Sequence, residues 1–227
     1  MKRTNETKTS AWDFLWYALY AFAALGMEFV LLSVIEPLLF QNADSSAYTA
    51  GQSILHWLLT CLCWGGITFA LIHFADGRLG FRVLSRERPT QKGVLSSVTL
   101  VALCILLNAL DWGTLKVAGE FVKKGPLLFG FQYLYYIFEV ALVFLIVAFG
   151  QKFGERLLGR KSNIPFGGLV LCFTWGAIHT LSQGSLATGL GVMVFALLYG
   201  CIYLLLSRNA RYSYLAMALA FRSPHFQ

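Results

Sequence analysis

Long apolar segments separated by short polar connections dominate this chain from Ala11 onward. A helix needs about 20 mainly apolar residues to cross the hydrocarbon core of a bilayer, and six runs come near or exceed this length. They cover Ala11–Phe40, Ile54–Phe74, Val94–Leu115, Leu127–Phe149, Phe166–Leu181 and Leu186–Leu206. The pattern therefore predicts an all-α, polytopic membrane helix bundle with about six transmembrane helices.

The first and last apolar runs need separate interpretation. Ala11–Phe40 is too long for the core of a signal peptide and ends in no small-residue cleavage pattern, so we expect an uncleaved first span. A seventh run, Tyr212–Phe221, is too short to cross, and we expect a short C-terminal half-helix that is half-inserted or lies at the interface. No low-complexity tract divides the chain, so 1–227 is predicted to be a single membrane domain.

The composition agrees with a membrane protein rather than a soluble one. Of the 227 residues, 57% are hydrophobic and 13% are charged, whereas soluble domains carry about 25% charged residues. The net charge of +7 requires no nucleic-acid partner, because Lys and Arg accumulate in the cytoplasmic loops of membrane proteins and the sequence has no nucleic-acid motif. All five cysteines lie in apolar segments without a C-x-x-C pair, so we expect no disulfide, no metal site and no cofactor.

Basic and non-basic connections alternate along the chain. Lys and Arg gather in the N-terminal segment and in three connections, 75–93, 151–163 and 207–211, whereas 41–52 and 182–185 contain neither. This alternation predicts six spans in a cell membrane with the N-terminus on the cytoplasmic side. One connection departs from the pattern, since Lys116, Lys123 and Lys124 fall on the predicted outer side.

Few ionisable residues interrupt the apolar runs, and each is a functional candidate because a charge buried in lipid is costly. Four of them lie near predicted helix ends, where solvation at the interface is the simpler explanation: Glu36, His56, His73 and Asp111. Glu28 lies deeper in the first span, and the sequence indicates no partner for it.

Glu139 and His179 differ from these residues in depth and in placement. Glu139 lies about 13 residues into its apolar run, near the bilayer centre at 1.5 Å per residue, and His179 lies in the next, antiparallel span. We hypothesise that Glu139 takes a proton from water as the water attacks a carbonyl, while His179 stabilises the oxyanion or protonates the leaving amine. The alternative is a structural Glu–His pair that fixes helix packing.

Three segments between about residues 78 and 220 share their order and spacing with one known family. RLGFRVLSRERP is a polar stretch before a core span, WGAIH matches an aromatic-x-x-x-His motif, and GCIYLLLSRNARYSYLAMALAF matches a closing Gly-rich helix, polar turn and apolar segment. Together they resemble the CPBP, or Abi, family of CAAX-protease and bacteriocin-processing intramembrane peptidases. The resemblance implies glutamate-dependent peptide cleavage in the membrane without an obligatory metal.

The resemblance assigns catalytic positions to Glu139 and His179, and four other family positions differ. The second Glu, the Arg, the second His and the Asn of the family are replaced here by Val140, Phe144, Met217 and Phe221. Met and Phe donate no hydrogen bond through their side chains. Losing one oxyanion donor typically lowers the rate by on the order of 10²–10³-fold.

Two functional hypotheses therefore remain open from the sequence. The chain is either a divergent intramembrane peptidase that cleaves a peptide or membrane-protein substrate, or a catalytically inactive relative. An inactive relative would act as a membrane partner, a regulatory protein or a bacteriocin self-immunity protein. A transporter is disfavoured because two related halves with paired interrupted spans are not visible. His225, in the tail RSPHFQ, is expected to be a solvated tail residue.

Overall fold

The computed structural model describes residues 9–41 and 44–221, and all regular elements in these ranges are helical. His225 lies outside them. The first span consists of α1 (Ala11–Leu25), α2 (Met27–Val30), the π-helical turn η1 (Leu31–Ile35) and α3 (Glu36–Phe40). After the 3-10 turn η2 (Ser45–Ala47), the chain forms α4 (Ala50–Leu79), α5 (Gln91–Trp112), α6 (Lys116–Leu157), α7 (Phe166–Leu171), the π-helical turn η3 (Cys172–Gly176), α8 (Ala177–Ser182), α9 (Leu186–Leu205) and α10 (Ala210–Leu219).

Five helical stretches are long and apolar enough to cross a membrane. They are Ala11–Phe40, Ala50–Leu79, Gln91–Trp112, Lys116–Leu157 and Leu186–Leu205. A sixth stretch, Phe166–Ser182, is apolar but shorter, and its 17 residues stand at the lower limit for a crossing of about 17–25 residues. The predicted all-α membrane bundle is therefore confirmed, with the fifth predicted span shorter than the others.

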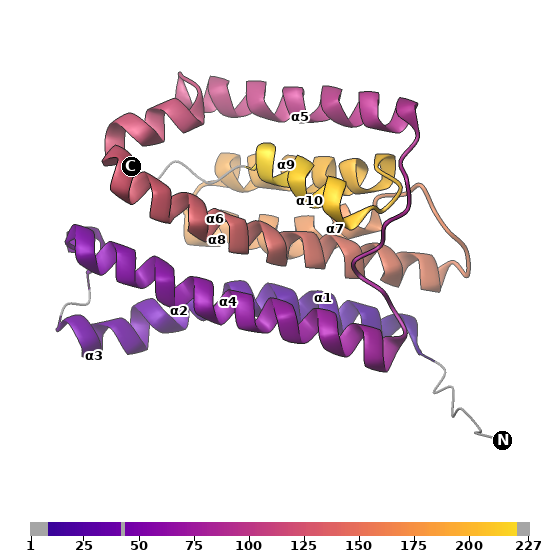
Figure 1. The fold of residues 1–227 in the computed structure, drawn as a ribbon, viewed down its shortest axis with the longest axis horizontal. Coiled ribbons are helices and arrows are strands. Elements are labelled where there is room, and N and C mark those ends of the chain that lie inside the picture. The colour runs from indigo at the N-terminus through magenta and orange to yellow at the C-terminus, as the bar shows by residue number, and fades with distance from the viewer. Residues whose placement is uncertain (1–8, 42–43, 222–227) are drawn as a thin grey trace.

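Helix α6 runs through the centre of the bundle, with the other spans around it (Figure 1). Every residue from Leu142 to Gln151 is buried, which explains why this apolar run shows no polar face. The sequence predicted a helix from Leu127, but α6 already begins at Lys116. Gly125, with φ 72° and ψ 167°, interrupts the helical geometry before Pro126, so a short helical segment precedes the kink.

Small residues bring the neighbouring helices close to α6. Ala18 and Ala21 of α1 are fully buried, and the Trp64 indole of α4 donates a 2.8 Å hydrogen bond to the backbone oxygen of Ala24. On α7, a Cβ atom added to Gly167 would lie 2.1 Å from the backbone oxygen of Val147. Only glycine at this position allows α7 to come so close to α6. Close backbone contact of this kind is a main source of helix association in membranes.

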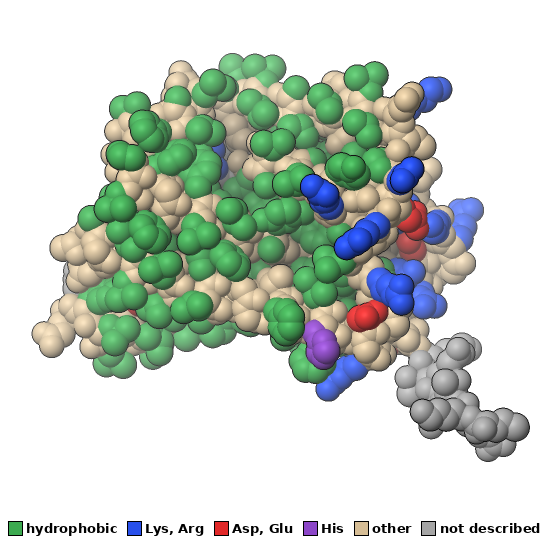
Figure 2. Space-filling view, in the orientation of Figure 1, with side chains coloured by type: hydrophobic (Ala, Val, Ile, Leu, Met, Phe, Trp, Pro, Cys, Tyr) green, Lys and Arg blue, Asp and Glu red, His purple; other side chains and the backbone are tan. Residues whose placement is uncertain are grey.

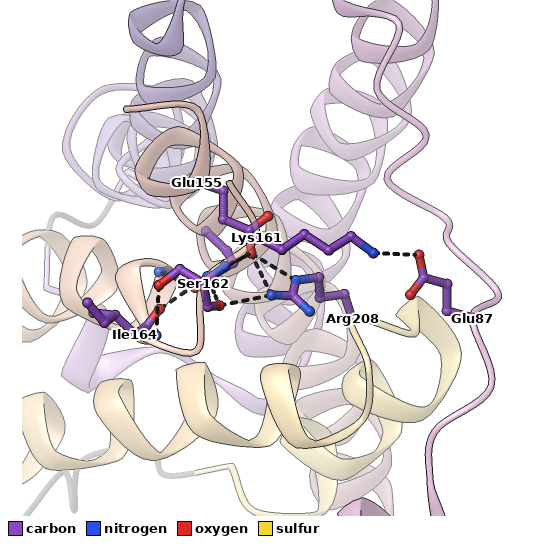
Figure 3. Close-up of polar contacts among 8 residues, drawn as sticks. Glu87, Glu155, Lys161, Ser162, Ile164 and Arg208 are labelled. Carbon is purple, nitrogen blue, oxygen red and sulfur yellow. Dashed lines mark hydrogen bonds and ion pairs between the residues drawn. The ribbon is translucent and has the colours of Figure 1, made fainter. Parts of the chain in front are cut away.

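On the face shown in Figure 2, Lys and Arg side chains gather at one end of the molecule, here called the basic end. The connections 80–90, 158–165 and 206–209 meet there (Figure 1). Glu155 of α6 accepts hydrogen bonds from Nε and Nη2 of Arg208, at 3.0 and 2.5 Å, and Nη2 also donates to the Ser162 carbonyl at 2.9 Å (Figure 3). Arg208 thereby ties the α9–α10 connection to the α6–α7 connection.

Helix α10 is the predicted C-terminal half-helix. Its N-cap is Asn209, whose side-chain oxygen accepts a 3.1 Å hydrogen bond from the Tyr212 amide. The inner face of α10 carries Ser213 and Met217, both fully buried, and contacts α5, α6 and α9. The half-helix thus packs against the bundle, and this packing, rather than the membrane–water interface alone, fixes its position.

Candidate functional site

Glu139 lies on α6 and is partly buried, and the Trp175 side chain lies close enough to interact with its carboxyl group. Trp175 belongs to η3 and is 2% exposed. Glu139 also interacts electrostatically with Glu28 of α2 and with Lys116 at the start of α6. The predicted catalytic carboxyl group therefore lies among charged and hydrogen-bonding groups from three separate spans.

His179 lies on α8, one helical turn after Trp175. Its Nδ1 atom is 2.6 Å from the Trp175 backbone oxygen, and the two rings pack edge to face with centroids 4.8 Å apart. Because a carbonyl oxygen only accepts, Nδ1 carries the proton and donates it, which makes Nε2 the acceptor of the neutral ring. Glu139 and His179 therefore adjoin the same residue, Trp175, which contacts one through its side chain and the other through its ring and backbone.

A second polar cluster joins the first span to α4 and α6, and the sequence analysis missed it. His56 of α4 places Nδ1 2.7 Å from Oε1 of Glu36 and Nε2 3.3 Å from Oε1 of Glu28. The Tyr135 hydroxyl donates a 2.8 Å hydrogen bond to the same Glu28 oxygen. The expectation of interfacial solvation was wrong for Glu36, which is 0% exposed, and for His56, which is 8% exposed.

The π-helical turn η1 accounts for the convergence of Glu28 and Glu36 on His56. Residues eight positions apart in a regular α-helix are offset by about 80° around its axis, since each residue turns about 100°. A π-turn inserts about one extra residue and so reduces this offset to roughly 20°. The run of apolar residues between the two carboxyl groups carries no visible signal for such a turn, so the sequence could not indicate this pairing.

Lys116 and Glu120 form a third polar group at the end of the bundle opposite the basic end. The Lys116 ammonium donates to the Phe221 backbone oxygen at 3.3 Å and lies 4.5 Å from the centroid of the Tyr136 ring. Both oxygens of Glu120 accept tyrosine hydroxyls, from Tyr133 at 2.9 Å and from Tyr136 at 2.8 Å. The sequence indicated that Lys116 lies in a connection between helices, whereas α6 begins at this residue and its side chain is only 9% exposed.

The four positions that depart from the family pattern are buried. Met217 is 0% exposed, Val140 1%, Phe144 4% and Phe221 5%. Phe221 packs directly against the candidate site, with its ring centroid 5.9 Å from that of Trp175 and 5.6 Å from that of Tyr136. An apolar ring thus covers the side of Trp175 that faces the C-terminal segment.

The remaining ionisable candidates lie apart from these clusters. His73 and Asp111 are exposed, and the His73 ring stacks on Phe69 with centroids 6.2 Å apart. Across residues 9–41 and 44–221, no three His, Cys, Asp or Glu side chains are arranged to hold a metal ion.

Comparison with known proteins adds no relative to this description. No family model, no curated protein and no solved structure matches the chain.

Proposed function

We propose that the chain is a divergent intramembrane peptidase of the CPBP type, with its N-terminus on the cytoplasmic side and Glu139 as the base that activates water. The observation that carries the proposal is the position of Trp175, whose side chain interacts with the Glu139 carboxyl group and contacts the His179 ring. An acid–base pair that shares one rigid, buried neighbour is held in place before substrate arrives, and such preorganisation favours catalysis.

The proposed reaction is hydrolysis of a peptide bond of a peptide or membrane-protein substrate. Glu139 accepts a proton from water as the water oxygen bonds to the carbonyl carbon. The tetrahedral oxyanion is stabilised by a protonated His179 ring, and the C–N bond then breaks as the leaving amine takes up a proton from Glu139 or His179. Lys116 adds positive charge near the Glu139 carboxyl group.

A second candidate function is that of a non-catalytic membrane partner, and the buried apolar positions favour it. Phe221 packs against Trp175, and Met217 is fully buried, so neither offers a donor to an oxyanion. Such a chain would bind a membrane protein or protect against a bacteriocin through its surface, with Glu139 and His179 stabilising the helix packing.

Cleavage in cells distinguishes the two candidates. Membrane fractions from cells that express the wild type, Glu139→Gln or Asp111→Asn are compared by mapping newly formed protein N-termini. Asp111 is an exposed carboxylate at the end of α5 and serves as the matched control. A peptidase generates N-termini in the wild type and in Asp111→Asn that are absent in Glu139→Gln. Identical sets in all three would exclude the peptidase and leave the partner function, which co-purification of the same protein with the wild type and Glu139→Gln would support.

A further inference from the structure

A cavity of about 600 Å³ opens near the basic end, between α4, α6, α10 and the connection 80–90. Its lining includes three arginines, Arg86, Arg88 and Arg211, here called the arginine rim, and apolar side chains that include Ile72 and Phe144. Figure 2 shows a recess with hydrophobic side chains inside it and Lys and Arg side chains beside it. The volume lies in the range of about 300–1,000 Å³ that is typical of ligand sites.

Hydrogen bonds hold the two parts of the arginine rim next to each other. The Asn209 side chain donates to the Glu87 carbonyl at 2.7 Å, and the Ala210 amide donates to the Ser85 carbonyl at 2.9 Å. These bonds attach the start of α10 to the connection that carries the other two arginines. The fold therefore brings the backbone segments that carry the three arginines to one cavity.

The charge of the arginine rim is not neutralised by the protein. Among the described residues, no Asp or Glu lines the cavity, and no member of the rim forms an ion pair. Glu87 lies between Arg86 and Arg88 in the sequence, but its carboxylate is directed to Lys161, 3.4 Å away (Figure 3). The rim thus offers its positive charge to an anion from outside the chain.

The depth of the cavity indicates the rest of the ligand. Thr68 lines its inner part and lies eleven residues before the end of α4, about 16 Å along the helix at 1.5 Å per residue. This distance is close to half of the roughly 30 Å hydrocarbon thickness of a bilayer. Leu84 and Tyr212, which also line the cavity, are 59% and 51% exposed, so the cavity is open to the surroundings of the protein.

We propose that this cavity binds one anionic phospholipid, with its phosphodiester on the arginine rim and part of an acyl chain along α4 and α6. Basic pockets between membrane helices are suited to anionic headgroups, and arginine donates to phosphate oxygens in pairs. A free phosphate would leave the apolar interior of the cavity without a partner, and a zwitterionic lipid would place its own cationic group next to the arginines. The proposal does not depend on peptidase activity.

Native mass spectrometry of the detergent-solubilised full chain tests this site by titration with phosphatidylglycerol. The wild type is expected to bind one phosphatidylglycerol molecule more tightly than phosphatidylcholine. The triple variant Arg86→Gln, Arg88→Gln, Arg211→Gln is expected to bind it about a hundredfold more weakly, at about fivefold per arginine. Arg160→Gln is the control, because it removes one exposed arginine at the basic end that does not line the cavity. Its affinity for phosphatidylglycerol should stay within about twofold of the wild type, a smaller change than the roughly fivefold expected for each rim arginine.

A second variant and a second ligand test the acyl part of the site. Ala141→Phe places a ring in the cavity and is expected to weaken phosphatidylglycerol binding while the arginine rim stays intact. Inorganic phosphate at the same concentration should not displace the lipid. The proposal is overturned if phosphatidylcholine binds equally tightly, if phosphate competes at equal concentration, if the triple variant binds like Arg160→Gln, or if a folded Ala141→Phe binds like the wild type.

Discussion

His56 and Glu36 form a buried contact of 2.7 Å between Nδ1 and Oε1, and the Glu36 carboxyl group has no exposed surface. Glu28 approaches the other ring nitrogen at 3.3 Å, so both nitrogens of the imidazole face a carboxyl oxygen. The cluster fixes the first span against α4, and it lies within electrostatic reach of Glu139 through Glu28.

Removing one partner of this cluster should destabilise the bundle. Glu36→Ala leaves His56 without its closest acceptor in an apolar environment, and breaking a buried pair in this way costs about 3–5 kcal/mol. Thermal unfolding of the purified chain in detergent is expected to show a clearly lower Tm. The control is His73→Ala, which removes an exposed imidazole from the same helix and should leave Tm nearly unchanged. Equal Tm values for the two variants would contradict a stabilising role for the buried cluster.

Gly167 should not tolerate even one additional methyl group. In Gly167→Ala the new Cβ atom would meet the Val147 carbonyl, a backbone atom that cannot rotate away, and we expect a loss of about 1–3 kcal/mol from overpacking. Gly66→Ala is the matched control, because nothing lies within 4 Å of its added Cβ atom and alanine favours the helix. Unfolding in detergent should therefore separate the two variants in opposite directions. Similar stability of both would mean that α7 does not pack against α6 as described.

The helical architecture could be predicted from the sequence because lipid imposes a simple rule on apolar runs. In the hydrocarbon core, a segment of this chain can pair its backbone hydrogen-bonding groups only by forming a helix. Length and hydropathy are therefore sufficient to locate α4, α5 and α9 within a few residues. The half-helix α10 was also predictable from its length. The early start of α6 was not, because Lys116 and Glu120 resemble loop residues until Tyr136 and Phe221 are placed next to them.

The candidate site was predictable only in part. Glu139 and His179 are isolated polar residues in apolar runs, and this isolation made both visible in the sequence. Both residues lie next to Trp175 only because α6 and η3 are placed near each other in the folded bundle, and no local sequence pattern encodes this placement. The pairing of Glu28 with His56 depends on the π-turn η1, whose residues are ordinary apolar ones.

Arg208 should stabilise the basic end mainly by compensating the charge of Glu155. The Glu155 side chain is 8% exposed and that of Arg208 is 19% exposed, so Arg208→Met leaves a carboxylate with little access to water. We expect this single variant to unfold at the lowest temperature in a set that includes Glu155→Gln and the double variant. The double variant should recover part of the loss, because the Glu155→Gln change keeps an acceptor at this position without the charge. A double variant less stable than Arg208→Met would show that the pair is not coupled in this way.

The two ends of the bundle should differ in their accessibility from outside the cell. In a variant lacking the five native cysteines, a single cysteine is introduced at Ser45 in the η2 turn or at Arg160 near the basic end, both exposed positions. With a membrane-impermeant maleimide, we expect Ser45→Cys to react in intact cells and Arg160→Cys to react only after permeabilisation. This result follows from the accumulation of Lys and Arg on the cytoplasmic side. The reverse labelling would reverse the proposed orientation of the N-terminus and place the arginine rim in the outer leaflet.

His179 should separate a catalytic role from a structural one through its two ring nitrogens. Nδ1 donates to the Trp175 carbonyl, and the amide nitrogen of Asn can occupy nearly the same position, whereas Asn has no group at the position of Nε2. His179→Asn is therefore expected to keep a Tm close to that of the wild type but to lower cleavage by about 10²–10⁴-fold, the usual contribution of a positioned acid or base. His179→Ala loses both groups and should lower Tm as well as cleavage. If His179→Asn retained both Tm and cleavage, Nε2 would have no part in the reaction, and His179 would serve only to hold Trp175 in place beside Glu139.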